Sequence, residues 1–128
     1  MKIAISSTGN NLESEVDARF GRCSYFLIVE IEDNKIKGFK AIENTAKAQM
    51  GGAGITAGEI VAKQKVDAII TVNLGPRAFS VFKQFKIKIY QGEGKIKKVI
   101  QKFLEGKLKE LSNATGPQHR GIKWKSII

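Results

Sequence analysis

The fold is decided by the stretch Val-Asp-Ala-Ile-Ile-Thr-Val at residues 66–72 and by the Asn-Leu-Gly-Pro that follows it at residues 73–76. A largely apolar run around Asp67 is typical of a strand covered on both faces. Pro76 is favoured at the first position of a helix, because its missing N–H would have no intrahelical partner there. We therefore expect a buried strand and then a helix to about Phe85. The helical residues expected in the core are Ala78, Phe79, Val81, Phe82 and Phe85.

Three more strands are expected before this stretch. A short apolar run covers residues 2–6, and the strongest strand signal, rich in β-branched and aromatic residues, covers residues 25–31. Residues 36–42 alternate apolar and polar side chains after a polar turn at residues 32–34. Because so short a turn can join only antiparallel strands, the last two form a hairpin.

The remaining elements alternate between helix and strand. A helix is expected after the glycine loop at residues 51–54, through about Lys65, and residues 87–90 are expected to form a short edge strand. The last helix begins at Ile96, with lysines mostly opposite its apolar stripe. The stripe comprises Ile96, Val99, Ile100, Phe103 and Leu104, and is expected to extend to Leu108 and Leu111.

The order of elements limits the topology. Parallel strands joined by helices use right-handed crossovers, so the simplest sheet has its first strand at the centre. The prediction is an α/β fold of the ribonuclease H-like type. It has a five-stranded mixed sheet in the order 3-2-1-4-5, with strand 2 antiparallel, and about three flanking helices. Residues 1–111 form the single predicted domain, and residues 112–128 a basic, mobile tail.

Length and composition favour a cytoplasmic protein with one core. A chain of 128 residues buries roughly two-thirds of its unfolded surface without disulfides or a structural metal. Its one cysteine cannot form an internal disulfide, which fits a reducing compartment. No apolar run resembles a signal peptide or a membrane span, so cytoplasm is the expected location.

The positive charge is concentrated toward the end of the chain. The net charge is +10, and residues 83–128 carry twelve Lys and Arg against three Asp and Glu. Such a region attracts anions, either nucleic acid, an acidic partner or a small charged ligand. The alternative is a solvated, lysine-rich helix face.

A binding crevice is expected where the first strand and the strand near residue 70 end, since ligands of open α/β sheets collect beyond the carboxyl ends of the strands. Two predicted helices begin there, and helix N-termini suit anions. The glycine loop allows close approach of a ligand, although a turn with positive φ explains it equally well. The residues expected at the crevice are Ser6, Gly51, Gly52, Gly54, Asn73 and Gly75.

The sequence contains almost none of the residue combinations that are typical of catalytic sites. His119 is the single histidine and lies in the predicted tail, and Cys23 is either a thiol activated by neighbouring arginines or a small core residue. A nuclease would need clustered carboxylates starting from the first strand, and residues 2–8 contain none. We therefore expect no enzymatic activity.

Four spaced motifs resemble the dinitrogenase iron–molybdenum cofactor biosynthesis family, which includes NifX-like proteins and the C-terminal domain of NifB. They are residues 18–26 (Ala-Arg-Phe-Gly-Arg-Cys-Ser-Tyr-Phe), 51–55 (Gly-Gly-Ala-Gly-Ile), 66–70 and 75–79 (Gly-Pro-Arg-Ala-Phe). The resemblance runs from Met1 to about Leu111.

The resemblance implies a ribonuclease H-like fold and a non-catalytic carrier of an anionic iron–sulfur or iron–molybdenum cofactor precursor. It also implies a cluster-donor or cluster-acceptor protein as partner. It adds Arg19, Phe20, Gly21 and Arg22 to the binding residues, with Cys23 and His119 as the candidate metal ligands. Family members often have His-Phe-Gly-Arg where this chain has Arg19 as the first residue. Because guanidinium does not ligate metals, the arginines are expected to hold a cluster by charge-assisted hydrogen bonds.

Overall fold

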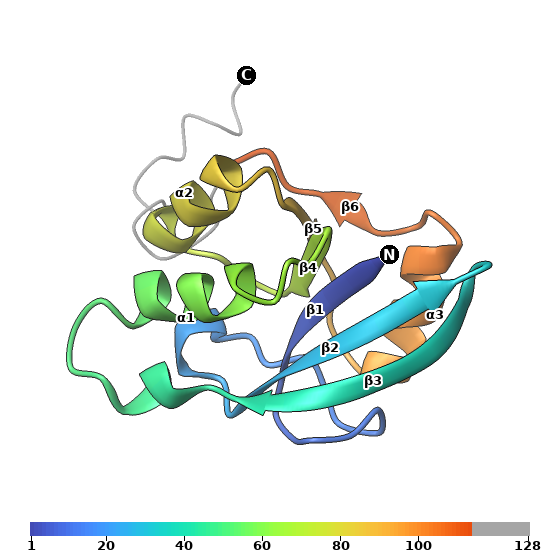
Figure 1. Ribbon diagram of the computed structural model, residues 1–128, viewed down its shortest axis with the longest axis horizontal. Coiled ribbons are helices and arrows are strands. Elements are labelled where there is room, and N and C mark those ends of the chain that lie inside the picture. Colours follow the sequence, from blue (N-terminus) through green and yellow to red (C-terminus); the bar gives the residue numbers. More distant parts are fainter. Residues whose placement is uncertain (114–128) are drawn as a thin grey trace.

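A computed structural model describes residues 1–113 as a six-stranded mixed sheet with helices on both faces (Figure 1). The strands lie in the order β3-β2-β1-β4-β5-β6. They are β1 (Lys2–Ser7), β2 (Tyr25–Glu32), β3 (Lys35–Glu43), β4 (Ala68–Thr71), β5 (Lys88–Gln91) and β6 (Lys109–Glu110). The helices are α1 (Ala53–Ala62), α2 (Pro76–Gln84) and α3 (Ile96–Leu104), with short 3-10 helices η1 (Phe20–Arg22) and η2 (Thr45–Ala48).

The central strand β1 is covered on both faces. It pairs with β2 in antiparallel and with β4 in parallel orientation. Ala4 belongs to the core beneath α1 and α2, whereas Ile3 and Ile5 belong to the core beneath α3. All three are fully buried, as the continuous apolar run of the first strand requires. Figure 1 shows α1 and α2 together on one side of the sheet and α3 on the other.

The order predicted for the first five strands is confirmed, but the strand count was wrong. A sixth strand, β6, pairs antiparallel with β5, so residues 87–90 do not lie at an edge. The helix α3 ends at Leu104, and the chain turns back at Gly106 with a φ of 71°. Leu111 then donates its backbone N–H to the carbonyl of Ile89 at 2.7 Å. The apolar stripe therefore does not continue into Leu108 and Leu111, and the ribonuclease H-like assignment stays a prediction.

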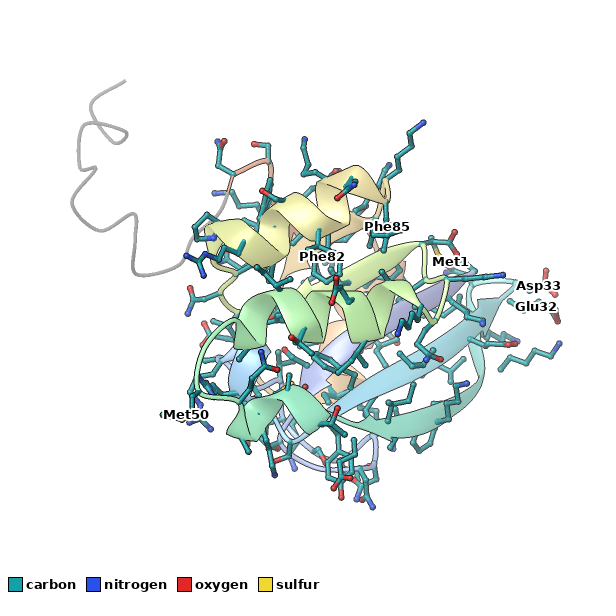
Figure 2. All side chains as sticks on the ribbon, turned by 60° about the vertical axis from the view of Figure 1, so that its left-hand side comes forward. Met1, Glu32, Asp33, Met50, Phe82 and Phe85 are labelled. Carbon is teal, nitrogen blue, oxygen red and sulfur yellow. The ribbon has the colours of Figure 1, made fainter. Side chains whose placement is uncertain are left out.

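The prediction that Phe85 is buried was wrong. The helix α2 ends at Gln84, so Phe85 lies beyond its last turn and is 58% exposed. Phe82, one turn earlier, is fully buried and meets the ring of Phe20 edge-on at 5.4 Å. Val81 is only half-buried. Figure 2 shows Phe82 between α2 and α1, and Phe85 at the end of α2.

The remaining predictions concern the C-terminal tail and membrane-spanning segments. The tail predicted at residues 112–128 lies almost wholly outside the described residues, so its mobility and the domain boundary stay predictions. Among residues 1–113, no helix is long and apolar enough to cross a membrane.

Phe82 and Phe85 form a matched pair for testing the core. Replacing Phe82 with alanine leaves a cavity between α2 and η1, and we expect it to lower the free energy of unfolding by about 3–5 kcal/mol. Phe85→Ala removes an exposed ring, and we expect a change within about 0.5 kcal/mol. Urea unfolding followed by circular dichroism measures both. Equal losses from the two substitutions would contradict this description of the core.

Candidate functional site

Two helices begin at the edge where β1 and β4 end. The helix α1 starts after Gly52, whose φ of 72° is left-handed, and α2 starts after Gly75 with Pro76 in its first turn. Neither helix has a side-chain cap or an acidic residue in its first turn. Unpaired N–H groups and the positive end of the helix dipole favour an anion at such an end. The predicted crevice edge therefore has the electrostatic character of an anion site.

The two helices lie parallel and close together. A Cβ at Gly54 would lie 3.9 Å from the Cβ of Ala78, and one at Gly58 would lie 3.3 Å from the side chain of Val81. The η1 segment packs on the first turn of α1, because a Cβ at Gly21 would lie only 3.1 Å from the backbone nitrogen of Gly54. Small residues thus bring η1 and both helix starts into one surface.

Arg19 and Asn73 lie side by side at this surface. They form an isolated parallel β-bridge, which joins the segment before η1 to the loop after β4. The backbone N–H of Arg19 donates to Oδ1 of Asp17 at 2.9 Å, and its Nε lies 3.6 Å from the same oxygen. The Arg19 side chain remains 72% exposed, so its guanidinium is accessible to a ligand.

Arg22 is occupied by contacts within the protein. Its guanidinium donates to the carbonyl of Lys47 at 2.7 Å and to the carbonyl of Gln49. The Gln49 amide in turn donates to the carbonyl of Gly51 at 2.6 Å. Arg22 therefore holds η2 and the glycine loop in place, which is a positioning role.

Ser6 and Phe20 lie beneath the surface. The Ser6 hydroxyl is fully buried and donates to the carbonyl of Asp17 at 2.9 Å, with Oγ1 of Thr71 at the same distance. Phe20 packs against Phe26 and Phe82 in the core. Both residues support the site from below and do not face solvent.

Cys23 is a core residue in this structure. It is fully buried, and its thiol donates to the carbonyl of Phe20 at 3.3 Å. Burial raises the pKa of the Cys23 thiol to about 12, so the protonated form predominates at neutral pH. Because a metal binds the thiolate, Cys23 is not prepared to act as a ligand here. The other candidate ligand, His119, lies outside the described residues.

No group of three or more His, Cys, Asp or Glu side chains in residues 1–113 could hold a metal ion. The site brings together the exposed Arg19 and Asn73 with the glycines at residues 51, 52, 54 and 75. This chemistry suits electrostatic and hydrogen-bonded capture of an anion.

Sequence reasoning missed three residues of the site. Asn44 caps η2 and donates to the carbonyls of Gly21 and Cys23, and Asp17 orients Arg19. Asn and Asp commonly bond to the backbone two residues later, which was the available signal for both. Met50, just before the glycine loop, is 99% exposed (Figure 2), and its thioether is a soft donor.

The fold and site define a small α/β protein with two uncapped helix starts at one edge of its sheet. Residues 1–106 match the family model described as dinitrogenase iron-molybdenum cofactor, and the chain belongs to that family. The resemblance seen in the sequence motifs is thereby confirmed.

Similar proteins come from several organisms. An uncharacterized protein of Methanocaldococcus jannaschii is 46% identical over 111 residues, which cover 86% of this chain and 91% of the relative. The apo form of the orange protein from Desulfovibrio gigas has a TM-score of 0.83 at 30% identity, covering 90% of this chain and 96% of that one. A Thermotoga protein proposed to be NifB has a TM-score of 0.76 at 32% identity, with coverages of 91% and 97%.

The labelling rate of the Cys23 thiol tests whether this residue is buried in the native protein. At pH 8, we expect a thiol reagent such as dithionitrobenzoate to label native Cys23 at least a hundredfold more slowly than the urea-unfolded chain. With a pKa of about 12, only about one thiol in ten thousand is ionised at that pH. Because the chain has one cysteine, the absorbance of the released thiolate reports this residue alone. Rapid stoichiometric labelling of the native protein would show that the thiol is accessible.

Proposed function

We propose that this protein is a non-catalytic carrier that binds an anionic iron–sulfur or iron–molybdenum cofactor precursor at the edge described above. Membership of the dinitrogenase iron-molybdenum cofactor family supports the class of ligand. The geometry of the two helix starts supports the place of binding. A cluster-donor or cluster-acceptor protein is the expected partner. The lone cysteine fits the reducing cytoplasm, where we propose that the carrier works.

The observation that carries the proposal is the charge at the two helix starts. A helix normally favours acidic side chains in its first turn, yet α1 and α2 have none there. The first turn of α2 contains Arg77, which is exposed, and Arg19 is exposed beside Asn73. Asp17 offsets part of the Arg19 charge, since its Oδ1 lies 3.6 Å from Nε of Arg19, whereas Arg77 adds positive charge at the dipole end of α2. A metal–sulfide anion is attracted to that combined charge.

The same features suit temporary binding. Residues 1–113 offer backbone N–H groups and arginine but no closed set of metal ligands. Charge-assisted hydrogen bonds hold an anion without replacing the metal's own ligands. A cluster held in this way can pass intact to a second protein that supplies stronger ligands.

The alternative function, nucleic-acid or acidic-partner binding by the basic C-terminal third, receives less support. Its lysines divide between two layers of the molecule. Lys83 and Lys86 lie at the end of α2, whereas Lys98 and Lys102 lie on α3, across the sheet. Lys97 is paired with Glu13 at 2.9 Å. The described part of this region does not form one continuous basic face.

Anaerobic binding of isolated iron–sulfur or iron–molybdenum clusters tests the carrier proposal. We expect the apo protein to retain cluster absorbance through gel filtration. Arg19→Ala is expected to weaken binding about tenfold, because one charge-assisted hydrogen bond contributes about 1.5 kcal/mol. Gly54→Ala should fold normally, since its new Cβ makes only an ordinary contact with Ala78.

Lys102→Ala serves as the matched control. It removes one positive charge from α3, on the other face of the sheet, and should bind clusters as the unmodified protein does. Absence of any retained absorbance, or equal weakening by Arg19→Ala and Lys102→Ala, would rule out binding at this edge.

A further inference from the structure

β3 is an unusually open edge strand. It is nine residues long, and all its residues except Ile42 are exposed. Figure 1 shows it along the outer edge of the sheet. Two of its large apolar side chains, Ile36 and Phe39, are 36% and 42% exposed. A long edge with exposed apolar residues is a template for pairing with another strand.

The alternation of hydrogen bonds between β2 and β3 shows which backbone groups of β3 are free to pair with another strand. The N–H of Asn44 donates to the carbonyl of Ser24, in register with the β2–β3 ladder. In an antiparallel pair, alternate residues direct their backbone groups to the partner strand. Lys40 and Ile42 therefore bond to β2. Phe39, Ala41 and Glu43 direct their N–H and C=O groups away from the sheet.

A cavity of about 360 Å³ adjoins this edge. It is lined by Lys2, Ile28, Glu30, Lys37, Gly38, Phe39 and Lys40. Apolar surface from Ile28 and Phe39 is thus combined with three lysines and one glutamate. Lys37 also contacts Glu32 at 3.4 Å, but both side chains are largely exposed, so this pair is weak. The cavity suits an apolar side chain flanked by carboxylates.

The charge on β3 indicates whether a second copy of this chain or a strand of another protein pairs with this edge. A second copy of the chain would bring the lysines at positions 35, 37 and 40 of both copies onto one ribbon. Edge lysines are a common device against such self-association. The same lysines attract an acidic strand. We propose that β3 and its cavity bind an extended acidic segment of a partner protein, which joins the sheet as an additional strand.

This position places the partner close to the proposed anion site. β2 is antiparallel to both β1 and β3, so β3 runs in the same direction as β1. Its carboxyl end leads through Asn44 into η2, and the carbonyls of Lys47 in η2 and of Gln49 just after it accept hydrogen bonds from Arg22. A segment paired along β3 therefore ends beside the loop that precedes α1.

The test uses apo protein and a capped seven-residue peptide of alternating glutamate and valine. Addition of a strand should slow hydrogen exchange of the Phe39, Ala41 and Glu43 amides at least tenfold at saturating peptide. The amides of Lys40 and Ile42, already bonded to β2, serve as internal references. Nuclear magnetic resonance measures both sets, and binding should weaken as salt is raised. Because no cluster is present, the result is independent of the carrier proposal.

Two substitutions separate the contribution of backbone hydrogen bonds to peptide binding from the contribution of charge. Ala41→Pro removes an outward N–H without removing a bond to β2, and edge strands tolerate proline. It should abolish peptide binding with the fold retained. Lys40→Glu keeps every backbone donor and should weaken binding at least tenfold, so it carries the test if the proline variant does not fold. Lys102→Glu, an equal charge reversal on α3, should have no effect.

Three results would overturn the proposal. The first is no amide protection at millimolar peptide and low salt. The second is equal binding of a control peptide with lysine in place of each glutamate. The third is a dimer of the peptide-free protein that Ala41→Pro dissociates, since this would show that a second copy occupies the edge.

Discussion

The structure depends on the burial of all of β1 after Lys2. Its residues 3–7 are shielded from solvent, so the chain must supply a helical layer for each face and a paired strand on each side. The hairpin of β2 and β3 occupies one side, and the parallel strands β4 and β5 occupy the other. Two consecutive right-handed crossovers then place α1 and α2 on the same face, with their N-termini at one edge. The position of the candidate site follows from this constraint.

Elements with a strong hydrophobic period could be predicted from the sequence, and elements formed only by tertiary pairing could not. The run at residues 66–72 and the stripe of α3 gave correct types and positions. β6 has two exposed residues, Lys109 and Glu110, and therefore no apolar pattern. It exists because Gly106 reverses the chain beside β5. Phe85 was misplaced because a helical period does not show where a helix ends.

The sequence indicated which segments meet at the candidate site, but not which of their side chains face solvent. Glycines and helix starts follow from topology, whereas the isolated bridge that brings Arg19 next to Asn73 does not. A motif does not reveal which of its side chains face inward. Phe20 and Cys23 enter the core, and Arg22 binds carbonyl oxygens of η2 and the following loop, so most of residues 20–23 supports the surface. Arg19 is the side chain of that motif that remains available.

The enclosure of Cys23 has a consequence for handling the protein in air. Oxidation to sulfenic acid or to an intermolecular disulfide proceeds through an exposed thiolate, and the native fold provides neither exposure nor ionisation. The cysteine is thus protected from mild oxidants as long as the chain stays folded, whereas the exposed thioether of Met50 is open to oxidation. If a preparation loaded with a metal–sulfur cargo loses colour under oxygen, the loss therefore does not begin with oxidation of Cys23.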